Sequence, residues 1–254
     1  MTTPLRAKMD KSKTIDKIIS DYIQNREGYI QLLRDNSYRL QTMLDNKIHS
    51  VIFRVKKPDS LRNKILKKID LKPQYKTITE KNYRTVVTDL GGIRILLLNQ
   101  TNWLYVDKAI NKLPNCTIIE KIAYLPSDMF EDDIESFRKA GFLTPSDGKK
   151  QYSSIHYVLK INEEGQDYGV ELQVRSLAEE QFAEIEHEVR YKSNSNYNSM
   201  VSSTLRNLSR AAGVMNYLSF QAYNCIKESQ PENTDEDFAA FEILLLLKNI
   251  SKKC

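Results

Sequence analysis

The stretch Gly169-Val-Glu-Leu-Gln-Val-Arg175 is the most informative feature of this 254-residue chain. Side chains alternate across a β-strand, so Val170, Leu172 and Val174 share one face. The carboxylate, the amide and the guanidinium of the same stretch lie in a row on the opposite face. This pattern predicts a strand that packs on a core with one face and holds a metal, a phosphate or both with the other.

A second carboxylate lies upstream in Thr88-Asp-Leu-Gly-Gly-Ile-Arg-Ile95. Asp89 precedes a double glycine, and Arg94 follows within an apolar strand pattern. Basic residues also follow one face of a third strand, predicted over residues 51–56, where Arg54 and Lys56 alternate with apolar side chains.

The remaining patterns predict an alternation of helices and strands. Apolar spacing indicates a helix over residues 14–48 and another at 103–113. We also expect a helix that begins at Pro58-Asp-Ser60, with Asp59 or Ser60 as its N-cap. The other expected elements are strands at about 92–98, 117–124 and 152–160, a loop-rich stretch over 126–150 and a hairpin through 162–165 that returns to the strand at 169.

The C-terminal part is predicted to be helical. Ser176-Leu-Ala-Glu179 matches a capping box, and it opens a helix whose expected core stripe is Ala178, Phe182, Ile185 and Val189. After a polar break at 193–199, a long helix carries an apolar seam spaced 4-3-4-3. With the apolar run 241–247, that seam predicts a homo-oligomer formed through the C-terminal region. The seam consists of Val201, Leu205, Leu208, Ala212 and Met215.

Composition indicates a globular chain with an adequate core. Hydrophobic residues make up 41% and charged residues 28%, and the net charge of +5 tolerates an anionic partner without requiring nucleic acid. Three widely spaced cysteines outside any Cys-x-x-Cys predict neither a disulfide framework nor a zinc site, so we expect a reducing cytoplasm. We find no apolar signal core and no run long enough to span a bilayer, so we expect no membrane partner.

Five motifs in order resemble the synthetase domain of the RelA/SpoT family, over roughly residues 40–195. These enzymes transfer pyrophosphate from ATP to the 3′-hydroxyl of GDP or GTP and make the alarmone (p)ppGpp. The resemblance implies an α+β fold, with a mixed sheet flanked by helices and related to nucleotidyltransferases. We therefore expect helical additions at 1–50 and 196–254 around a synthetase domain at 51–195. The motifs are Arg54-x-Lys56-x3-Ser60-x3-Lys64, Asp89-x-Gly91-Gly92-x-Arg94, Tyr152-Ser-Ser-x-His156, Glu171-x-Gln173-x-Arg175 and Glu186-His187-x3-Tyr191-Lys192.

For the donor nucleotide, the resemblance implies that Arg54 and Arg94 clamp the adenine of ATP. It implies that Lys56, Ser60 and Lys64 hold the phosphates. Clustered cations of this kind offset the negative charge of a triphosphate.

For catalysis, the resemblance implies that Asp89 and Glu171 bind Mg²⁺ and that Glu171 is also the base on the 3′-hydroxyl. Phosphoryl-type transfer depends mainly on positioning and charge neutralisation, and a ribose hydroxyl needs a base to become a nucleophile. Tyr152 would stack on the acceptor base. The phosphate and acceptor region would be lined by His156, Gln173 and Arg175.

Two departures from the family concern the acceptor. The sequence reads Gln151-Tyr-Ser-Ser154 where the family has a cation after the tyrosine, and Lys149 and Lys150 are candidates to supply that charge. Glu180 replaces an asparagine that can read guanine in small synthetases, although a carboxylate can accept hydrogen bonds from guanine N1–H and N2–H.

The resemblance is to a stand-alone small alarmone synthetase, because the chain has no His-Asp pair of the kind found in the family's hydrolase domain. Two alternatives remain open. Some stand-alone relatives pyrophosphorylate the 3′ end of tRNA or make adenosine alarmones, and basic runs such as residues 64–72 permit that function. A non-catalytic nucleotide- or RNA-binding module is the other alternative, which the presence of both Asp89 and Glu171 disfavours.

Taken singly, each of these residues also has a structural interpretation. Glu171 alone fits a solvated strand carboxylate, and Tyr152 alone fits a core aromatic with a wet hydroxyl. The joint pattern favours a functional site for them. For His187 we keep the structural interpretation, as a helix residue braced by its neighbours.

Overall fold

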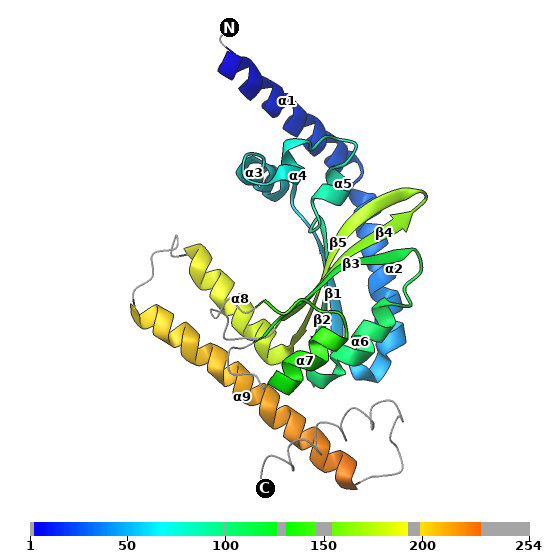
Figure 1. Cartoon of the computed structure of the whole chain (residues 1–254), viewed down its shortest axis with the longest axis vertical. Helices are drawn as coiled ribbons and strands as arrows, with labels where there is room; N and C mark the ends of the chain where they lie inside the picture. The colour runs from blue at the N-terminus through cyan, green and yellow to red at the C-terminus, as the bar shows by residue number, and fades with distance from the viewer. Residues whose placement is uncertain (1–2, 99, 126–130, 146–153, 193–198, 230–254) are drawn as a thin grey trace.

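The computed structural model describes residues 3–98, 100–125, 131–145, 154–192 and 199–229 (Figure 1). In Figure 1, α1 and α3 to α5 lie beyond one end of a central sheet, and α8 and α9 lie beyond the other. The elements in chain order are α1 (Thr3–Gln24), α2 (Arg26–Leu44), the 3-10 turn η1 (Asp45–Lys47), β1 (Ser50–Val55), α3 (Pro58–Lys68), α4 (Pro73–Lys76), α5 (Tyr83–Val86), β2 (Gly91–Leu97), η2 (Gln100–Asn102), α6 (Trp103–Ile110), β3 (Cys116–Tyr124), α7 (Glu131–Lys139), β4 (Ser154–Glu163), β5 (Gln166–Ser176), α8 (Leu177–Lys192) and α9 (Ser199–Ser229).

The sheet has five strands in the order β1-β2-β5-β4-β3. Strands β2 and β5 are parallel neighbours, whereas the other three pairs are antiparallel. The predicted α+β fold with a mixed sheet and flanking helices is therefore confirmed. The parallel pair at the centre brings the Asp89 motif next to the Glu171 motif, because Gly92 pairs with Glu171.

One face of the sheet is the main core. Val170, Leu172 and Val174 of β5 are at most 2% exposed, as their alternation predicts. They belong to one cluster with buried side chains of α2, α6 and α7. Trp103 of α6 stacks on Phe137 of α7 at a ring-centroid distance of 4.4 Å. Covering this face with helices leaves the other face of the sheet for polar side chains.

A second apolar cluster lies beyond the end of the sheet and joins α1 to α3, α4 and α5. Tyr22 of α1 is fully buried there, and its hydroxyl donates a hydrogen bond of 2.6 Å to the backbone oxygen of Lys56. Leu61 and Ile65 of α3 pack into the same cluster. These contacts fix the chain between β1 and α3, where the predicted phosphate-binding residues lie.

Local motifs near the site form as predicted. The hairpin between β4 and β5 turns at Glu164 and Gly165, which have φ angles of 49° and 80°. Two successive positive φ values suit a two-residue hairpin loop. In the capping box of α8, the Ser176 backbone N–H donates to Glu179 at 2.9 Å, and the Glu179 N–H donates back to the Ser176 hydroxyl at 3.1 Å.

Three predictions of secondary structure were wrong in detail. The helix expected over 14–48 is two helices, with a break at Asn25 (φ −99°, ψ 6°). The N-cap of α3 is Lys57, not Asp59 or Ser60, because Pro58 occupies the first helical position and restricts the residue before it to extended backbone. The stretch predicted as loop contains α7, which buries Phe137 in the core.

The two C-terminal helices bury less of their apolar surface than expected. Phe182 of α8 is buried, but Ile185 in the predicted core stripe is 37% exposed. In the seam of α9, Ala212 is buried, whereas Met215 is 56% exposed. The run 241–247 lies outside the described residues. Within the described residues, we find no helix that is both long and apolar enough to span a membrane.

Candidate active site

The polar face of the sheet collects side chains from adjacent strands. The register places Gly92 of β2 beside Glu171 of β5, and Arg94 beside Gln173. On the other side of β5, His156 of β4 pairs with Gln173. Residues paired in register point to the same face, so two sequence motifs about 80 residues apart contribute to one surface.

A cavity of about 160 Å³ opens on this face at the β1–β2 side. Gly92 forms part of its floor, and a Cβ added there would lie 3.4 Å from Cγ of Arg54. That distance is an ordinary van der Waals contact, so the Arg54 side chain lies directly against Gly92. The cavity is lined by Ile52, Phe53, Arg54, Gly92, Ile93, Arg94, Glu171, Gln173 and Glu184.

Asp89 lies just before β2 and is contacted by two lysines. Lys64 Nζ is 2.5 Å from Asp89 Oδ1, and Lys56 Nζ is 3.1 Å from Oδ2. Burial raises the pKa of Asp89, but the contacts with Lys64 and then Lys56 outweigh it, so the pKa lies below the usual value. Asp89 is therefore a carboxylate at neutral pH, with two ammonium groups beside it.

Glu171 makes its contacts with the neighbouring strands. His156 Nδ1 is 3.4 Å from Glu171 Oε1, and Gln173 Nε2 donates to Oε2 at 3.1 Å. The contact with His156 lowers the pKa of Glu171, and it outweighs both burial and the negative charge of Asp89, which act in the opposite direction. Glu171 is thus ionised, within electrostatic range of the second carboxylate.

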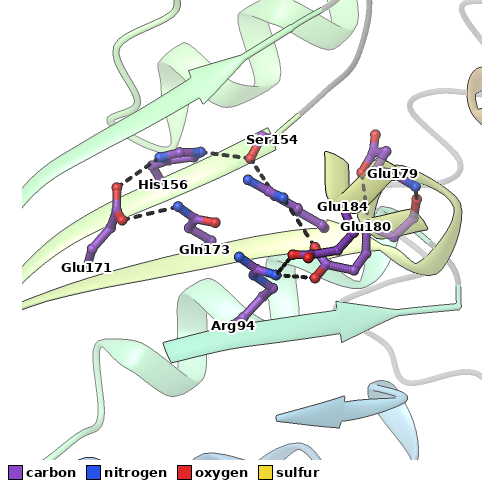
Figure 2. Close-up of polar contacts among 10 residues, drawn as sticks. Arg94, Ser154, His156, Glu171, Gln173, Glu179, Glu180 and Glu184 are labelled. Carbon is purple, nitrogen blue, oxygen red and sulfur yellow. Dashed lines mark hydrogen bonds and ion pairs between the residues drawn. The ribbon is translucent and has the colours of Figure 1, made fainter. Parts of the chain in front are cut away.

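A line of polar contacts continues from Glu171 toward α8 (Figure 2). The His156 Nε2 atom is 2.7 Å from the Ser154 hydroxyl, which accepts a hydrogen bond of 3.3 Å from Arg175 Nε. Arg175 Nη1 also donates to Glu180 Oε2 at 3.2 Å. The chain of contacts therefore joins the centre of the sheet to the first turns of α8.

Arg94 is held by two carboxylates of α8. Its Nη1 donates to the Oε1 atoms of both Glu180 and Glu184, the latter at 2.9 Å. The hydrogen bond from Arg94 lowers the pKa of Glu184 more than burial raises it. The guanidinium that the resemblance assigns to adenine is therefore fixed in direction by α8, and Arg94 itself lines the cavity.

The donor atoms on this face suit a hard cation. Gln173 Oε1 is a buried oxygen without a hydrogen-bond partner among the described residues, whereas the two carboxylate oxygens of Asp89 are paired with Lys64 and Lys56. Nowhere in the described parts of the chain do three or more His, Cys, Asp or Glu side chains form a potential metal cluster. Oxygen ligands from only one or two carboxylates, completed by substrate phosphates, are the usual arrangement for Mg²⁺.

Most of the predicted site residues lie on or beside this face. Ser60 is exposed on the first turn of α3, and Lys56 and Lys64 approach Asp89 from one side. Tyr152 and Lys149 lie outside the described residues. Five lining residues of the cavity were not among the predicted site residues, namely Ile52, Phe53, Gly92, Ile93 and Glu184. The spacing of Glu184 one helical turn after Glu180 was the available signal.

A comparison with known protein families identifies the class of protein to which this site belongs. The family described as "Region found in RelA / SpoT proteins" matches residues 53–196. This segment is more than half of the chain and runs from within β1 to the end of α8 and beyond, so the chain belongs to the RelA/SpoT family. The match supports a pyrophosphokinase of the (p)ppGpp synthetase type. No curated protein matches the chain.

Solved structures share the fold. A GTP pyrophosphokinase family protein from Streptococcus pneumoniae aligns with a TM-score of 0.63 and 20% identity, over 84% of this chain and 98% of that one. Small alarmone synthetase 1 from Bacillus subtilis aligns with a TM-score of 0.63 and 19% identity, over 82% and 98%. The same synthetase bound to its product pppGpp gives 0.56 and 21%, over 80% and 94%. At these identities the likeness establishes the fold.

Proposed function

We propose that this protein transfers the β,γ-pyrophosphate of ATP to the 3′-hydroxyl of GDP or GTP and makes (p)ppGpp. The proposal rests on the cavity in the polar face of the sheet, where Arg54 and Arg94 lie beside the ionised Glu171. Family membership and the fold shared with a synthetase whose structure contains pppGpp support the same reaction class.

In this proposal the donor nucleotide enters at the β1–β2 side. Arg54 and Arg94 hold the adenine between planar guanidinium groups, which stack on aromatic rings as an ammonium group cannot. Lys56, Ser60 and Lys64 bind the phosphates. The two lysines already converge on Asp89 from the segment that Tyr22 and the second core cluster fix in place.

Asp89 and Glu171 are the proposed Mg²⁺ ligands. When bound, the ion would neutralise phosphate charge and orient the pyrophosphate oxygens. The protein would contribute the carboxylate oxygens of Asp89, which lie beside Lys56 and Lys64, and those of Glu171.

The chemical step needs a base and an orientated acceptor. Glu171 would accept the proton of the ribose 3′-hydroxyl while that oxygen attacks the β-phosphorus of ATP, and the bond between the α- and β-phosphates breaks to release AMP. A carboxylate with a lowered pKa remains available as a base at neutral pH. The proposed acceptor-binding residues are Tyr152, His156, Gln173, Arg175, Glu180 and Lys149.

A second candidate acceptor is the 3′ end of tRNA, and one observation favours it. Several lysines lie close together along α3 and just after it. Burial lowers the pKa of Lys68, and the nearby positive charges of Lys64 and Lys72 lower it further. A concentrated positive surface beside the donor site would attract a polyanion. Adenosine nucleotides are the other alternative acceptor, as in stand-alone relatives that make adenosine alarmones.

One experiment separates these acceptors. The protein is incubated with Mg²⁺ and ATP labelled in the β-phosphate, with GDP, GTP, AMP, ADP and tRNA offered in parallel. Label in the guanosine nucleotides supports the proposal. Label only in tRNA or only in adenosine nucleotides would replace the acceptor, and ATP binding without any labelled product would favour a non-catalytic nucleotide-binding module. Asp89→Asn protein serves as the control for contaminating activity.

We further propose that the chain acts in the cytoplasm as a homo-oligomer. Its three dispersed cysteines suit a reducing compartment. Large apolar side chains exposed on α9 support association with a second copy. These are Val214, Met215, Tyr217 and Leu218, which are 56–61% exposed.

A further inference from the structure

Glu180 connects two arginines from different strands. Its Oε1 accepts from Arg94 Nη1 of β2, and its Oε2 accepts from Arg175 Nη1 of β5 at 3.2 Å. All three side chains are 11–18% exposed, so the contacts are largely shielded from water. A carboxylate that uses one oxygen for each guanidinium ties the positions of the two groups together.

The sheet register explains why a carboxylate is needed at this place. Arg94 pairs with Gln173, and Arg175 pairs with Leu96, so the two arginines are diagonal neighbours on the same face of parallel strands. Two guanidinium groups this close would repel each other with little water to screen them. The negative charge of Glu180, which is paired with both guanidinium groups, offsets that repulsion.

The two arginines belong to different halves of the proposed site. Arg94 lines the cavity assigned to the donor nucleotide. Arg175 is connected to Glu171 by successive contacts through Ser154 and His156. If a bound nucleotide moves one guanidinium, the Glu180 carboxylate moves with it, and its hydrogen bond to the other guanidinium changes. Among the described residues, Glu184 has no such double role, because it pairs with Arg94 and with no second arginine.

We propose that Glu180 is a positioning residue that couples the binding of the donor nucleotide to the binding of the acceptor nucleotide. This inference rests on the proposed function, since it uses the donor and acceptor assignments made there. Each nucleotide that holds its own arginine in this arrangement also holds the shared carboxylate, and through it the second arginine. The two nucleotides therefore bind with positive cooperativity, which is reciprocal by thermodynamic linkage.

The test measures binding without turnover. Adenosine α,β-methylene triphosphate keeps the donor shape but has no cleavable oxygen bridge between the α- and β-phosphates. Its dissociation constant is measured by calorimetry with Mg²⁺, with and without saturating GDP, and GDP is then titrated with and without the analogue. In the wild type we expect each nucleotide to tighten the other by at least about 5-fold.

Glu180→Gln should reduce that factor to near 1, even if it also weakens GDP through loss of a proposed acceptor contact, because the factor compares dissociation constants within one variant. The matched variant is Glu184→Gln, which removes an Arg94 partner but leaves the bridge, so it should keep the coupling even if it weakens the analogue. Glu131→Gln breaks an exposed pair with Arg138 far from the site and should change nothing. Should Glu180→Gln fold poorly, Arg175→Lys keeps the charge but loses the planar fork, and should also uncouple the two nucleotides.

The outcomes are distinct. Coupling that persists in both Glu180→Gln and Arg175→Lys, or that is missing in the wild type although both nucleotides bind, would overturn the bridge and leave the proposed function standing. Failure of the wild type to bind either the ATP analogue or GDP would overturn both. Equal loss of coupling in Glu180→Gln and Glu184→Gln would assign the effect to Arg94 pairing in general, and would also reject the specific role of Glu180.

Discussion

Lys64 Nζ lies 2.5 Å from Asp89 Oδ1, and this ion pair links α3 to the start of β2. Lys56 approaches the other carboxylate oxygen, so Asp89 balances two positive charges that the proposed reaction needs for phosphate. The same carboxylate is a proposed metal ligand. A single side chain thus organises the cations of the donor site and contributes to the metal site.

Removing that charge should abolish transfer. Asp89→Asn keeps the shape of the side chain but leaves Lys56 and Lys64 without their counter-ion, and we expect a loss of about 1–2 kcal/mol in the free energy of unfolding. Turnover of labelled ATP measures the loss of transfer, and urea unfolding followed by circular dichroism measures the loss of stability. Asp70→Asn, which breaks the exposed pair with Lys11, is the control for stability. Substantial turnover by purified Asp89→Asn protein would remove Asp89 from the catalytic site.

Glu171→Gln should lower kcat by about 10²-fold or more, because a positioned general base contributes ~10²–10⁴-fold. Binding of the ATP analogue should change much less, since the cavity wall and both arginines remain. Single-turnover assays with labelled ATP and calorimetry of the analogue separate the two effects. A variant with near-normal kcat would show that another group takes the proton.

Arg94→Lys should weaken the use of ATP although the charge is kept. Lysine has neither the planar surface for stacking nor the forked donors that reach Glu180 and Glu184 together. We expect a higher KM for ATP, by about 10-fold for a loss near 1.4 kcal/mol, with an accompanying decrease in kcat. Unchanged kinetic constants for ATP would mean that Arg94 serves only as an ion-pair partner of α8.

The ionisation of Glu184 provides a test that does not depend on activity. The Arg94 hydrogen bond lowers its pKa in the folded protein. The pair therefore stabilises the fold above the ordinary carboxyl pKa, and the stabilisation is lost as pH falls through the lowered value. Because Glu184 is 62% exposed, the contribution is about 0.2–1 kcal/mol.

Arg94→Gln should raise the Glu184 pKa toward the ordinary value for glutamate, as measured by carboxyl-carbon NMR titration. The pKa of Asp167, which its contacts with Asn162 and Lys160 lower, should be the same in both proteins. Identical Glu184 curves in the wild type and the variant would contradict the hydrogen bond.

The exposed apolar surface of α9 predicts association in solution. At micromolar concentration, light scattering should give a mass of at least two chains for the wild type. Met215→Lys combined with Leu218→Lys places charges on side chains that are 56% and 58% exposed, so it should dissociate the oligomer with little effect on the fold. A strict monomer for the wild type would refute the predicted assembly.

Local patterns accounted for much of the fold. Strict alternation predicted β5, and the reciprocal Ser176–Glu179 pattern predicted the start of α8, because both depend on neighbours close in sequence. The break at Asn25 carries no proline or glycine, so apolar spacing runs through it. The helix over 131–139 was hidden by flanking prolines and glycines, and it gains its stability from the stacking of Phe137 on Trp103.

The sequence predicted which residues belong to the candidate site, but it did not predict how their side chains contact one another. The motifs identified Asp89, Arg94 and Glu171 as one group, but no pattern places Glu180 between two arginines. That arrangement depends on the register of β2 against β5 and on the direction in which α8 leaves the sheet. Both are tertiary properties, set by the packing of the core.

The parallel pairing of β2 with β5 also has a consequence for synthesis. Its partners are about 80 residues apart, so closing that loop carries an entropic cost that short hairpins avoid. While the chain grows from its N-terminus, β2 has only β1 beside it and presents an open edge until β5 follows. Arg94 meets its α8 partners later still. A nascent chain that stops before residue 180 would therefore hold most of the motifs but lack the two carboxylates that orient Arg94.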